Sequence, residues 1–586
     1  MDLFEYVWLT SFQITKKNHE EVKILLRDDI RYPALGKERR GYVICLPKPI
    51  RRKDGQISYL GLLFDPQNAM HRRLLWQTFK ASVFHLSMHV AASDYEVYAD
   101  WSKDKNVDLA TFVVSMLEDA VVRAGLKTLW TPFINDVAIA DALSYLKTKP
   151  AHLILNPTLR FMASLIVGYS MGKIKNVQPP MATEVVNVVS ALNEIQKVVQ
   201  NGLNKMSTLE QNGEISQKIT DLSLMHRIAT ADVMYEALEK YGEISEAPSL
   251  LYTENHGSSS IFFGNDIPSE LQIRESLKEA LGSLQVSPNG NGALLNLVDR
   301  SLENEVSQVF SAMQSREVAE RKILENYRIL GNGSRFRSFE FPREDFSEYI
   351  YRKALLSSPI RRSLDRLRLL KNLTGEDYRH EMGSLDMQEA IQVVASKSQR
   401  TDVFVRDELQ AREDAWAILV DGSHSLKSFT GEVRDITLCL SEVARSLFPS
   451  QNAWSAFAFS DKFYIVKEFS ENYNNRVRAR IGGLEQGGMT YLTDAVILTA
   501  QALKKRTEES RLMVVVSDFF PSGYVGAEDT LRGCVRKIEN SGTGVIGVGV
   551  RSRAVRNYFR INCVVYNPLE LMKKFVDAFF EFSAMA

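Results

Sequence analysis

The C-terminal third of the sequence contains short apolar runs that alternate with amphipathic segments. Uninterrupted apolar runs are typical of strands that are covered on both faces of a sheet. Between them, Phe429 to Leu447 and Leu571 to Phe579 carry apolar residues every three or four positions, which predicts helices. The pattern predicts a doubly wound α/β sheet. The expected strands are 416–420, 454–459, 463–466, 512–517, 545–550 and 563–566.

Polar residues follow two of these strands directly. Asp421, Ser423 and Ser425 follow the first strand, and Asp518 follows the run 512–517. Thr490 adds a hydroxyl on a glycine-rich loop. The carboxyl ends of parallel strands share one edge of a sheet, so these side chains are expected to meet there. Carboxylate and hydroxyl oxygens are the ligands that Mg²⁺ prefers, so the sequence predicts a magnesium site.

This set resembles the metal-ion-dependent adhesion site (MIDAS) of the von Willebrand factor A (VWA) domain. The family pattern is D-x-S-x-S, a later Thr and a later Asp, and it matches Asp421, Ser423, Ser425, Thr490 and Asp518. The resemblance implies hydroxyls and water-holding carboxylates around Mg²⁺, with one position open to a partner's carboxylate. It therefore implies a protein-binding site without catalytic residues. The alternative is an α/β domain whose strand-end loops are merely rich in Asp, Ser and Thr.

Residues outside the site are similar to those of a narrower group, the NorD and CbbO proteins. They are Gly383–Asp386, Arg406–Asp407, Asp414–Trp416 and Gly526–Thr530. This resemblance implies a helical N-terminal region, a C-terminal VWA domain and a MoxR-family AAA+ ATPase as partner. Together the two proteins would remodel, activate or metallate a client enzyme. Phe519 and Phe520 depart from the family, which commonly has glycine after the final Asp.

Three regions are expected along the chain. We expect a mainly helical N-terminal domain over residues 1–250, a helical middle region and connector over residues 251–410, and the VWA domain over residues 411–586. One clear helix signal is Asn156-Pro157, because Asn is a good N-cap and Pro suits the first helical position. The fold class is therefore multidomain, with a mainly α-helical N-terminal region and a C-terminal α/β domain.

The amino-acid composition limits the kinds of partner that the chain is expected to bind. The 586 residues carry 72 basic and 72 acidic side chains, a formal net charge of zero. A nucleic-acid partner for the whole chain is therefore not expected. The four cysteines form no C-x-x-C pair, and Cys439 and Cys563 are expected to be buried thiols. No signal peptide and no membrane-spanning segment are predicted, so the expected location is cytoplasmic.

A second, rival metal site is predicted in the N-terminal region. His85 and His89 lie four residues apart on an expected helix, so both imidazoles can face one ion. Glu118, or the adjacent Asp119, could add a third ligand from a later helix. Leu86 occupies the position of the general base in the H-E-x-x-H pattern, which disfavours a metalloprotease. Two helix histidines with ordinary hydrogen bonds are the plainer interpretation.

The chain is not expected to hydrolyse ATP itself. The segment Gly168–Ile174 has too short a glycine spacing for a P-loop, and Ile174 replaces the hydroxyl residue. The leading hypothesis is a non-enzymatic adaptor that works with a MoxR-type ATPase. The alternatives are a metal-dependent enzyme or zinc-stabilised domain at His85 and His89, or a VWA interaction scaffold without an ATPase.

Overall fold

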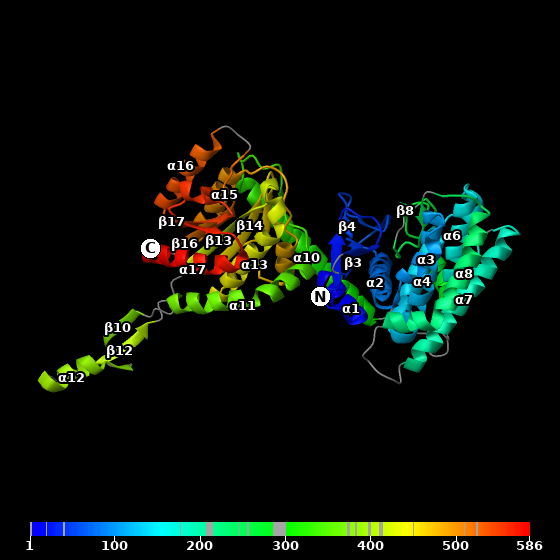
Figure 1. Cartoon of the computed structure of the whole chain (residues 1–586), viewed down its shortest axis with the longest axis horizontal. Helices are drawn as coiled ribbons and strands as arrows, with labels where there is room; N and C mark the ends of the chain where they lie inside the picture. The colour runs from blue at the N-terminus through cyan, green and yellow to red at the C-terminus, as the bar shows by residue number, and fades with distance from the viewer. Residues whose placement is uncertain are drawn as a thin grey trace. The chain divides into compact units, whose positions relative to one another are not determined.

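The structure is a computed structural model of the 586-residue chain. It forms two compact units, Met1–Arg316 and Glu317–Ala586, so the division differs from the boundaries expected at 250 and 410. Figure 1 labels the elements of each unit. The structure describes residues 3–18, 20–38, 41–175, 177–206, 215–244, 246–254, 257–258, 260–284, 300–371, 375–380, 382, 384–396, 400–408, 414–448, 450–508, 510–522 and 526–585.

The N-terminal unit is mainly helical, as expected, with small sheets near its start. In one of these sheets β3 pairs with β1 in parallel and with β2 in antiparallel register. The elements are α1 (Leu3–Thr15), β1 (Val22–Arg27), β2 (Ala34–Glu38), β3 (Gly41–Pro47), β4 (Ile50–Arg51), β5 (Ile57–Tyr59), β6 (Leu62–Phe64), α2 (Ala69–Ala92), α3 (Ala99–Ser102), α4 (Val107–Leu129), α5 (Ile134–Lys147), α6 (Pro157–Met171), α7 (Met181–Met206), α8 (Ile215–Glu239), β7 (Ala247–Pro248), β8 (Gly257–Ser258), α9 (Glu270–Ser283) and residues 300–316 of α10 (Arg300–Leu330).

Helix α2 is the centre of this unit. Every residue from Arg73 to Ala92 is buried, and the helix packs against α1, α4, α5 and α8. A helix without an exposed face belongs in the interior. Its first turn is capped by Asn68, whose side chain accepts hydrogen bonds from the amides of Met70 and His71. Polar residues on α2 therefore point into the core and need partners there.

The helix signal at Asn156 is confirmed. The Asn156 side chain accepts a hydrogen bond from the Leu159 amide at 3.0 Å, and Pro157 is the first residue of α6. The helix ends at Gly172, which has a left-handed φ of 67°. Gly168 lies inside the helix and Gly172 caps it, so the segment Gly168–Ile174 is a helix end rather than a phosphate-binding loop.

The C-terminal unit is an α/β unit built on a seven-stranded mixed sheet with the order β18-β17-β16-β13-β14-β15-β9. The first five strands run parallel, and β15 is antiparallel to β14. The elements are residues 317–330 of α10, β9 (Phe339–Glu340), α11 (Phe346–Lys371), β10 (Gly375–His380), β11 (Ser384–Leu385), α12 (Met387–Ser396), β12 (Phe404–Glu408), β13 (Asp414–Asp421), α13 (Thr430–Leu447), β14 (Trp454–Phe459), β15 (Phe463–Lys467), α14 (Asn475–Gly482), α15 (Leu492–Lys504), β16 (Ser510–Ser517), α16 (Ala527–Asn540), β17 (Thr543–Val550), β18 (Ile561–Val565) and α17 (Pro568–Met585).

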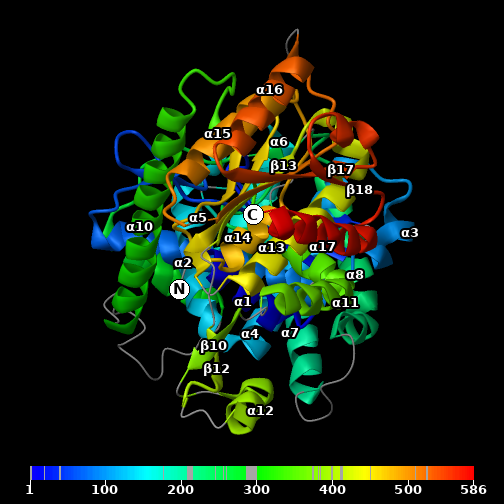
Figure 2. The same cartoon turned by 90° about the vertical axis from the view of Figure 1, so that its left-hand side faces the viewer.

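Helices cover both faces of the sheet, as its apolar strands predict. Helices α15 and α16 lie on one face and α13 and α17 on the other, above and below the strands in Figure 2. Successive residues of β13 point to opposite faces. Trp416 packs against Phe448, Phe575 and Phe579, whereas Ala417 and Leu419 join the core beneath α15 and α16.

The segment expected to be a connector contributes to this unit, which corrects the predicted domain start at 411. Strand β9 pairs with β15, and α11 packs against α13, α14 and α17. Ile360 and Leu367 of α11 are buried. The α/β unit therefore begins before residue 411. Gly383, one of the residues similar to NorD and CbbO, lies outside the described residues.

The contact between α14 and α11 gives a test of this packing. A Cβ at Gly482 would lie 2.1 Å from the Asp345 carbonyl oxygen and 2.8 Å from the Tyr349 nitrogen. We expect Gly482→Ala to lower the free energy of unfolding by about 1–3 kcal/mol, because backbone cannot yield as a flexible side chain can. Gly533→Ala in α16 is the control: nothing lies within 4 Å, and helix propensity favours alanine by about 1 kcal/mol. Urea denaturation measures the free energy of unfolding of both variants. If Gly482→Ala were as stabilising as Gly533→Ala, the close contact at Gly482 would be contradicted.

Candidate metal centres

The first candidate site lies where β13 and β16 end side by side. These strands are parallel, with Val420 opposite Val516. Asp421 is therefore the last residue of one strand, and Asp518 follows the last residue of its neighbour. Both carboxylates belong to the carboxyl edge of the sheet, where ligands of doubly wound sheets bind.

The Asp421 loop brings carboxylate and hydroxyl oxygens together. Asp421 is fully buried, and its Oδ1 accepts a hydrogen bond from the Ser423 amide at 2.8 Å. The Ser423 and Ser425 hydroxyl oxygens lie 3.0 Å apart. The loop is fixed from behind by the Gly422 amide, which donates to the Phe459 carbonyl. Two hydroxyls and one carboxylate thus share one short turn.

The glycine-rich loop with Thr490 is attached to both neighbouring loops. The Gly488 carbonyl accepts a hydrogen bond from the His424 amide at 3.1 Å. On the other side, the Thr490 amide donates to the Ser522 hydroxyl at 3.1 Å. Ser522 belongs to the segment that follows Asp518. The structure therefore places Thr490 between the Asp421 loop and the Asp518 loop.

Charge at this site is concentrated and buried. Burial, together with the nearby Asp518 carboxylate, raises the pKa of Asp421 to about 7 against hydrogen bonds from Ser517 and Ser423. The Asp518 charge thus disfavours the ionised form of Asp421. A divalent cation would favour both ionised carboxylates. The donors are all oxygens, from carboxylates and hydroxyls, and this set fits Mg²⁺.

Two residues of this site were missed by sequence reasoning. The Ser517 hydroxyl donates to Asp421 Oδ2 at 2.5 Å and orients the buried carboxylate. Ser522 holds Thr490, as described above. Ser517 precedes Asp518 directly, so its place at a strand end was the available signal. His424, in the same loop as Ser423 and Ser425, is exposed.

Phe519, at a position where VWA domains commonly have glycine, has a strained backbone conformation. Its φ is +58°, in the left-handed region that glycine adopts without strain. Burial against Phe559, with ring centroids 5.0 Å apart, holds the residue in this conformation. By contrast, the side chain of Phe520 is 63% exposed, and that of Met489 on the neighbouring loop is 52% exposed. The edge of the sheet therefore presents two apolar side chains beside the candidate site.

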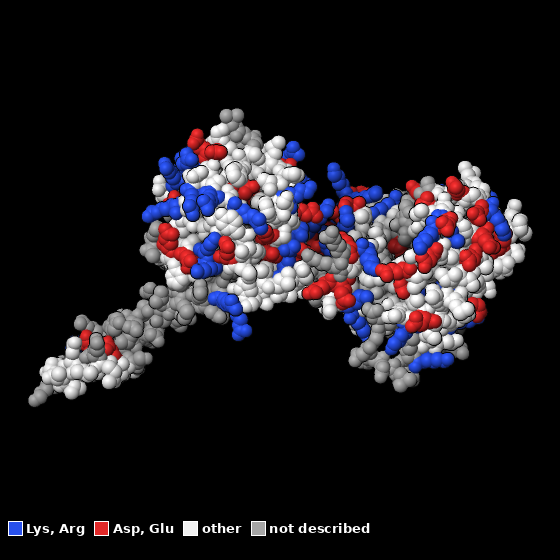
Figure 3. Space-filling model, in the orientation of Figure 1, with Lys and Arg blue, Asp and Glu red and all other residues white. Residues whose placement is uncertain are grey.

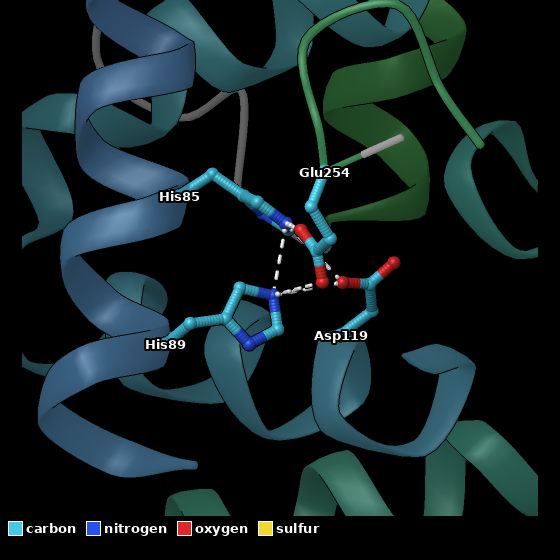
Figure 4. Close-up of side chains that lie close together, drawn as sticks. All are labelled: His85, His89, Asp119 and Glu254. Carbon is cyan, nitrogen blue, oxygen red and sulfur yellow. Dashed lines mark hydrogen bonds and ion pairs between the residues drawn. The ribbon is translucent and has the colours of Figure 1, made fainter. Parts of the chain in front are cut away.

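The second candidate site lies in the N-terminal unit and is shown in Figure 4. His85 and His89 project from α2, Asp119 from α4 and Glu254 from the segment after β7. The two imidazole Nε2 atoms lie 3.0 Å apart. Asp119 Oδ1 lies 3.2 Å from Nε2 of His85 and 3.1 Å from Nε2 of His89. Glu254 reaches the same two nitrogens at 2.9 and 3.1 Å.

Glu118 is not part of this cluster. Its carboxylate faces the other way, where it accepts hydrogen bonds from Arg227 at 2.9 Å and from the Tyr98 hydroxyl at 2.8 Å. The neighbouring Asp119 takes the expected place, one residue further along α4. Glu254 was missed entirely, because it lies 165 residues beyond His89 and carries no local signal.

The electrostatics of the cluster are those of opposite charges held together in the interior. Burial lowers the pKa of His89, but the carboxylates of Glu254 and Asp119 outweigh it and raise the pKa to about 10. For Glu254, burial acts upward, while His89 and His85 hold the pKa well below its usual value. The four side chains therefore form a strongly coupled polar group inside an otherwise apolar core.

Comparisons with known proteins give weak structural likenesses, two of which follow. No protein-family model matches the chain, and no curated protein resembles it in sequence. The manganese-loaded TRAP protein of Plasmodium vivax aligns with a TM-score of 0.23 and 15% identity over 28% of this chain and 72% of that one. The RO (RSR) protein of Deinococcus radiodurans aligns with a TM-score of 0.19 and 12% identity over 83% and 94%. Both likenesses are too weak to assign a fold or a function.

Proposed function

We propose that the C-terminal unit is a VWA-type protein-binding module whose MIDAS holds Mg²⁺. The observation that carries the proposal is the meeting of the Asp421, Thr490 and Asp518 loops at the carboxyl edge of one sheet. Asp421, Ser423, Ser425, Thr490 and Asp518 are the residues that would hold the ion. Bound there, the ion would supply an electrophilic position for a carboxylate of a partner protein.

The surroundings of the site support protein binding rather than catalysis. Phe520 and Met489 are exposed beside it, and exposed apolar side chains next to polar groups are typical of protein interfaces. The carboxylates of the proposed ligand set are Asp421 and Asp518, and the nearby Asp461, beside Gly488, is paired with Arg337. Two-metal hydrolases require more carboxylates than this. The proposed role is therefore non-enzymatic.

We further propose that the chain is an adaptor for a MoxR-family AAA+ ATPase. This part rests on the similarity of Asp414–Trp416 and Gly526–Thr530 to the NorD and CbbO proteins. The adaptor would connect the ATPase to a client enzyme, which is then remodelled, activated or metallated. The four cysteines are free, which accords with the cytoplasm as the compartment. Among the described residues, no helix is long and apolar enough to cross a bilayer.

Surface charge agrees with a protein partner. In Figure 3 basic and acidic side chains are interspersed over the face in view. Nucleic-acid binding typically needs a basic stripe or patch on one face. The net charge of zero provides no general attraction for phosphate.

The proposal is tested by affinity purification of the tagged full chain together with the MoxR-family ATPase of the same source. We expect the hexameric ATPase to be retained in Mg²⁺ and to be lost with Asp421→Ala. Asp577→Ala is the matched control, because this carboxylate is exposed on α17, outside the proposed site and the segments similar to NorD and CbbO. Retention of the ATPase by Asp421→Ala at the wild-type level would contradict a MIDAS-dependent contact.

A further inference from the structure

The cluster of His85, His89, Asp119 and Glu254 is independent of the proposed MIDAS, because it belongs to the other unit of the chain. We propose that these four side chains bind one divalent transition metal of the zinc class in a closed, structural site. The ion would connect three segments that are distant in sequence: α2, α4 and the segment 246–254. Figure 4 shows the four side chains pointing toward one another.

The distances between the donor atoms fit such an ion. The nitrogen–nitrogen and nitrogen–oxygen separations within the cluster range from 2.9 to 3.2 Å. Zinc ligands at about 2.0–2.2 Å in tetrahedral geometry lie about 3.3–3.6 Å from one another. The donors therefore need to move apart by only a few tenths of an ångström to enclose the ion.

Nδ1 of His89 faces two hydroxyl partners, whereas Nε2 faces the cluster. His89 Nδ1 lies 2.8 Å from the Ser93 hydroxyl and 3.0 Å from the Tyr95 hydroxyl. With Nδ1 donating to one of these hydroxyls, the lone pair of Nε2 is available to a metal ion in place of its contacts with His85 and Asp119. That lone pair faces the Nε2 atom of His85 across 3.0 Å. A cation placed between the two nitrogens would accept the lone pair of each.

Glu254 supplies an independent observation. Its side chain is buried, and Oε1 lies 3.1 Å from His89 Nε2 without meeting, among the described residues, a donor in hydrogen-bond geometry. This ion pair without an aligned donor leaves part of the cost of burying the carboxylate oxygen uncompensated. Coordination to a cation would remove this cost. One dication would also balance the two negative charges of Asp119 and Glu254.

The donor set selects the class of metal and the type of site. Two imidazoles with two carboxylates suit zinc and its neighbours better than Mg²⁺, which prefers oxygen ligands alone. Four protein ligands fill a tetrahedral shell, as in structural zinc sites, whereas catalytic sites keep a position open. Leu86 also stands where a zincin has its general base. The site therefore stabilises the unit rather than performing hydrolysis.

An entry path is present. A cavity of about 830 Å³ is lined by residues that include Glu254, Ser93 and Tyr95. The same three residues contact the histidines of the cluster. The site thus lies at the wall of a cavity in the N-terminal unit, so that small ions and chelators can reach it.

Zinc analysis of the full-length chain tests this inference. After chelation and re-addition of zinc, we expect one zinc per chain by elemental analysis, and none with the double variant His85→Ala/His89→Ala. His226→Ala is the matched control, since His226 is exposed on α8 and should leave zinc content unchanged. Asp421→Ala should also keep its zinc. Loss of the MIDAS and loss of this site are therefore distinguishable.

Two further measurements keep the inference falsifiable if the double variant does not fold. Asp119→Asn preserves the shape of the side chain and should weaken zinc binding about 10- to 100-fold. The wild-type chain loaded with Co²⁺ should show the intense visible bands of tetrahedral coordination, and zinc should raise its melting temperature by about 5 °C. A wild-type chain without these bands, or with unchanged zinc affinity in Asp119→Asn, would overturn the proposal.

Discussion

Replacing Arg227 by methionine is expected to lower the free energy of unfolding of the N-terminal unit by about 3–5 kcal/mol. The Arg227 and Glu118 side chains are both 0% exposed, with Nη1 of the arginine 2.9 Å from Oε1 of the glutamate. Removing the guanidinium leaves the Glu118 carboxylate buried without an opposite charge, and its hydrogen bond from Tyr98 cannot replace that charge. Urea denaturation of the full chain measures the loss as a lower transition midpoint.

The expected loss has two controls. Arg274→Met removes an exposed arginine whose partner Glu270 is 50% exposed, and such a pair contributes about 0.5 kcal/mol or less. The double variant Glu118→Leu/Arg227→Met replaces both charges by apolar groups and should recover much of the lost stability. If Arg227→Met were as stable as the wild type, Glu118 would have to be neutral or otherwise compensated in the fold.

The same ion pair explains why the rival metal site was only half predictable. His85 and His89 were recognisable because four residues on a helix place two side chains on one face. The choice between Glu118 and Asp119 depends on which way each faces. Arg227, which takes Glu118 away from the histidines, is more than a hundred residues distant in sequence. Glu254 reaches the cluster from a loop, where no periodicity announces a ligand.

The C-terminal sheet was more predictable, since its signal is local. Each expected strand is present within two or three residues at its ends; for example, 512–517 corresponds to β16, Ser510–Ser517. The edge strand β9 was missed because a two-residue strand leaves no hydrophobic pattern. Helix α11 lies within the segment expected to be a connector, because its packing depends on tertiary contacts. Arg352, for example, is paired with Glu348 and Asp435.

The predicted ligand residues of the MIDAS were expected to meet because strand ends carry them to one edge. What the sequence could not show is the network behind them. Ser517 orients the buried Asp421, and Ser522 ties Thr490 to the loop after Asp518. Both are serines among many others in the chain. Their roles depend on hydrogen-bond geometry that exists only after the two strands pair.

Removing the Asp421 carboxylate is expected to weaken divalent-cation binding at the sheet edge by at least about 100-fold, since loss of even an outer-shell partner costs about 10- to 100-fold. Asp421 is buried and holds the turn that presents Ser423 and Ser425, so Asp421→Ala removes charge and ligand geometry together. Titration with Mn²⁺, followed by electron paramagnetic resonance and by competition with Mg²⁺, measures the affinity. The measurement uses the His85→Ala/His89→Ala background, so that the second centre cannot contribute.

Two variants decide whether the effect belongs to a MIDAS. Thr490→Ser keeps the hydroxyl and should bind Mn²⁺ nearly as the wild type does, whereas Thr490→Ala should lose about tenfold or more. Asp529→Ala, an exposed carboxylate in the same unit, should leave binding unchanged. Equal binding by Thr490→Ser and Thr490→Ala would exclude the Thr490 hydroxyl as a ligand. The backbone hydrogen bonds that hold the Thr490 loop between the two carboxylate loops remain in both variants, so the fold would be intact. Such a result would therefore argue against the octahedral oxygen site on which the adaptor role depends.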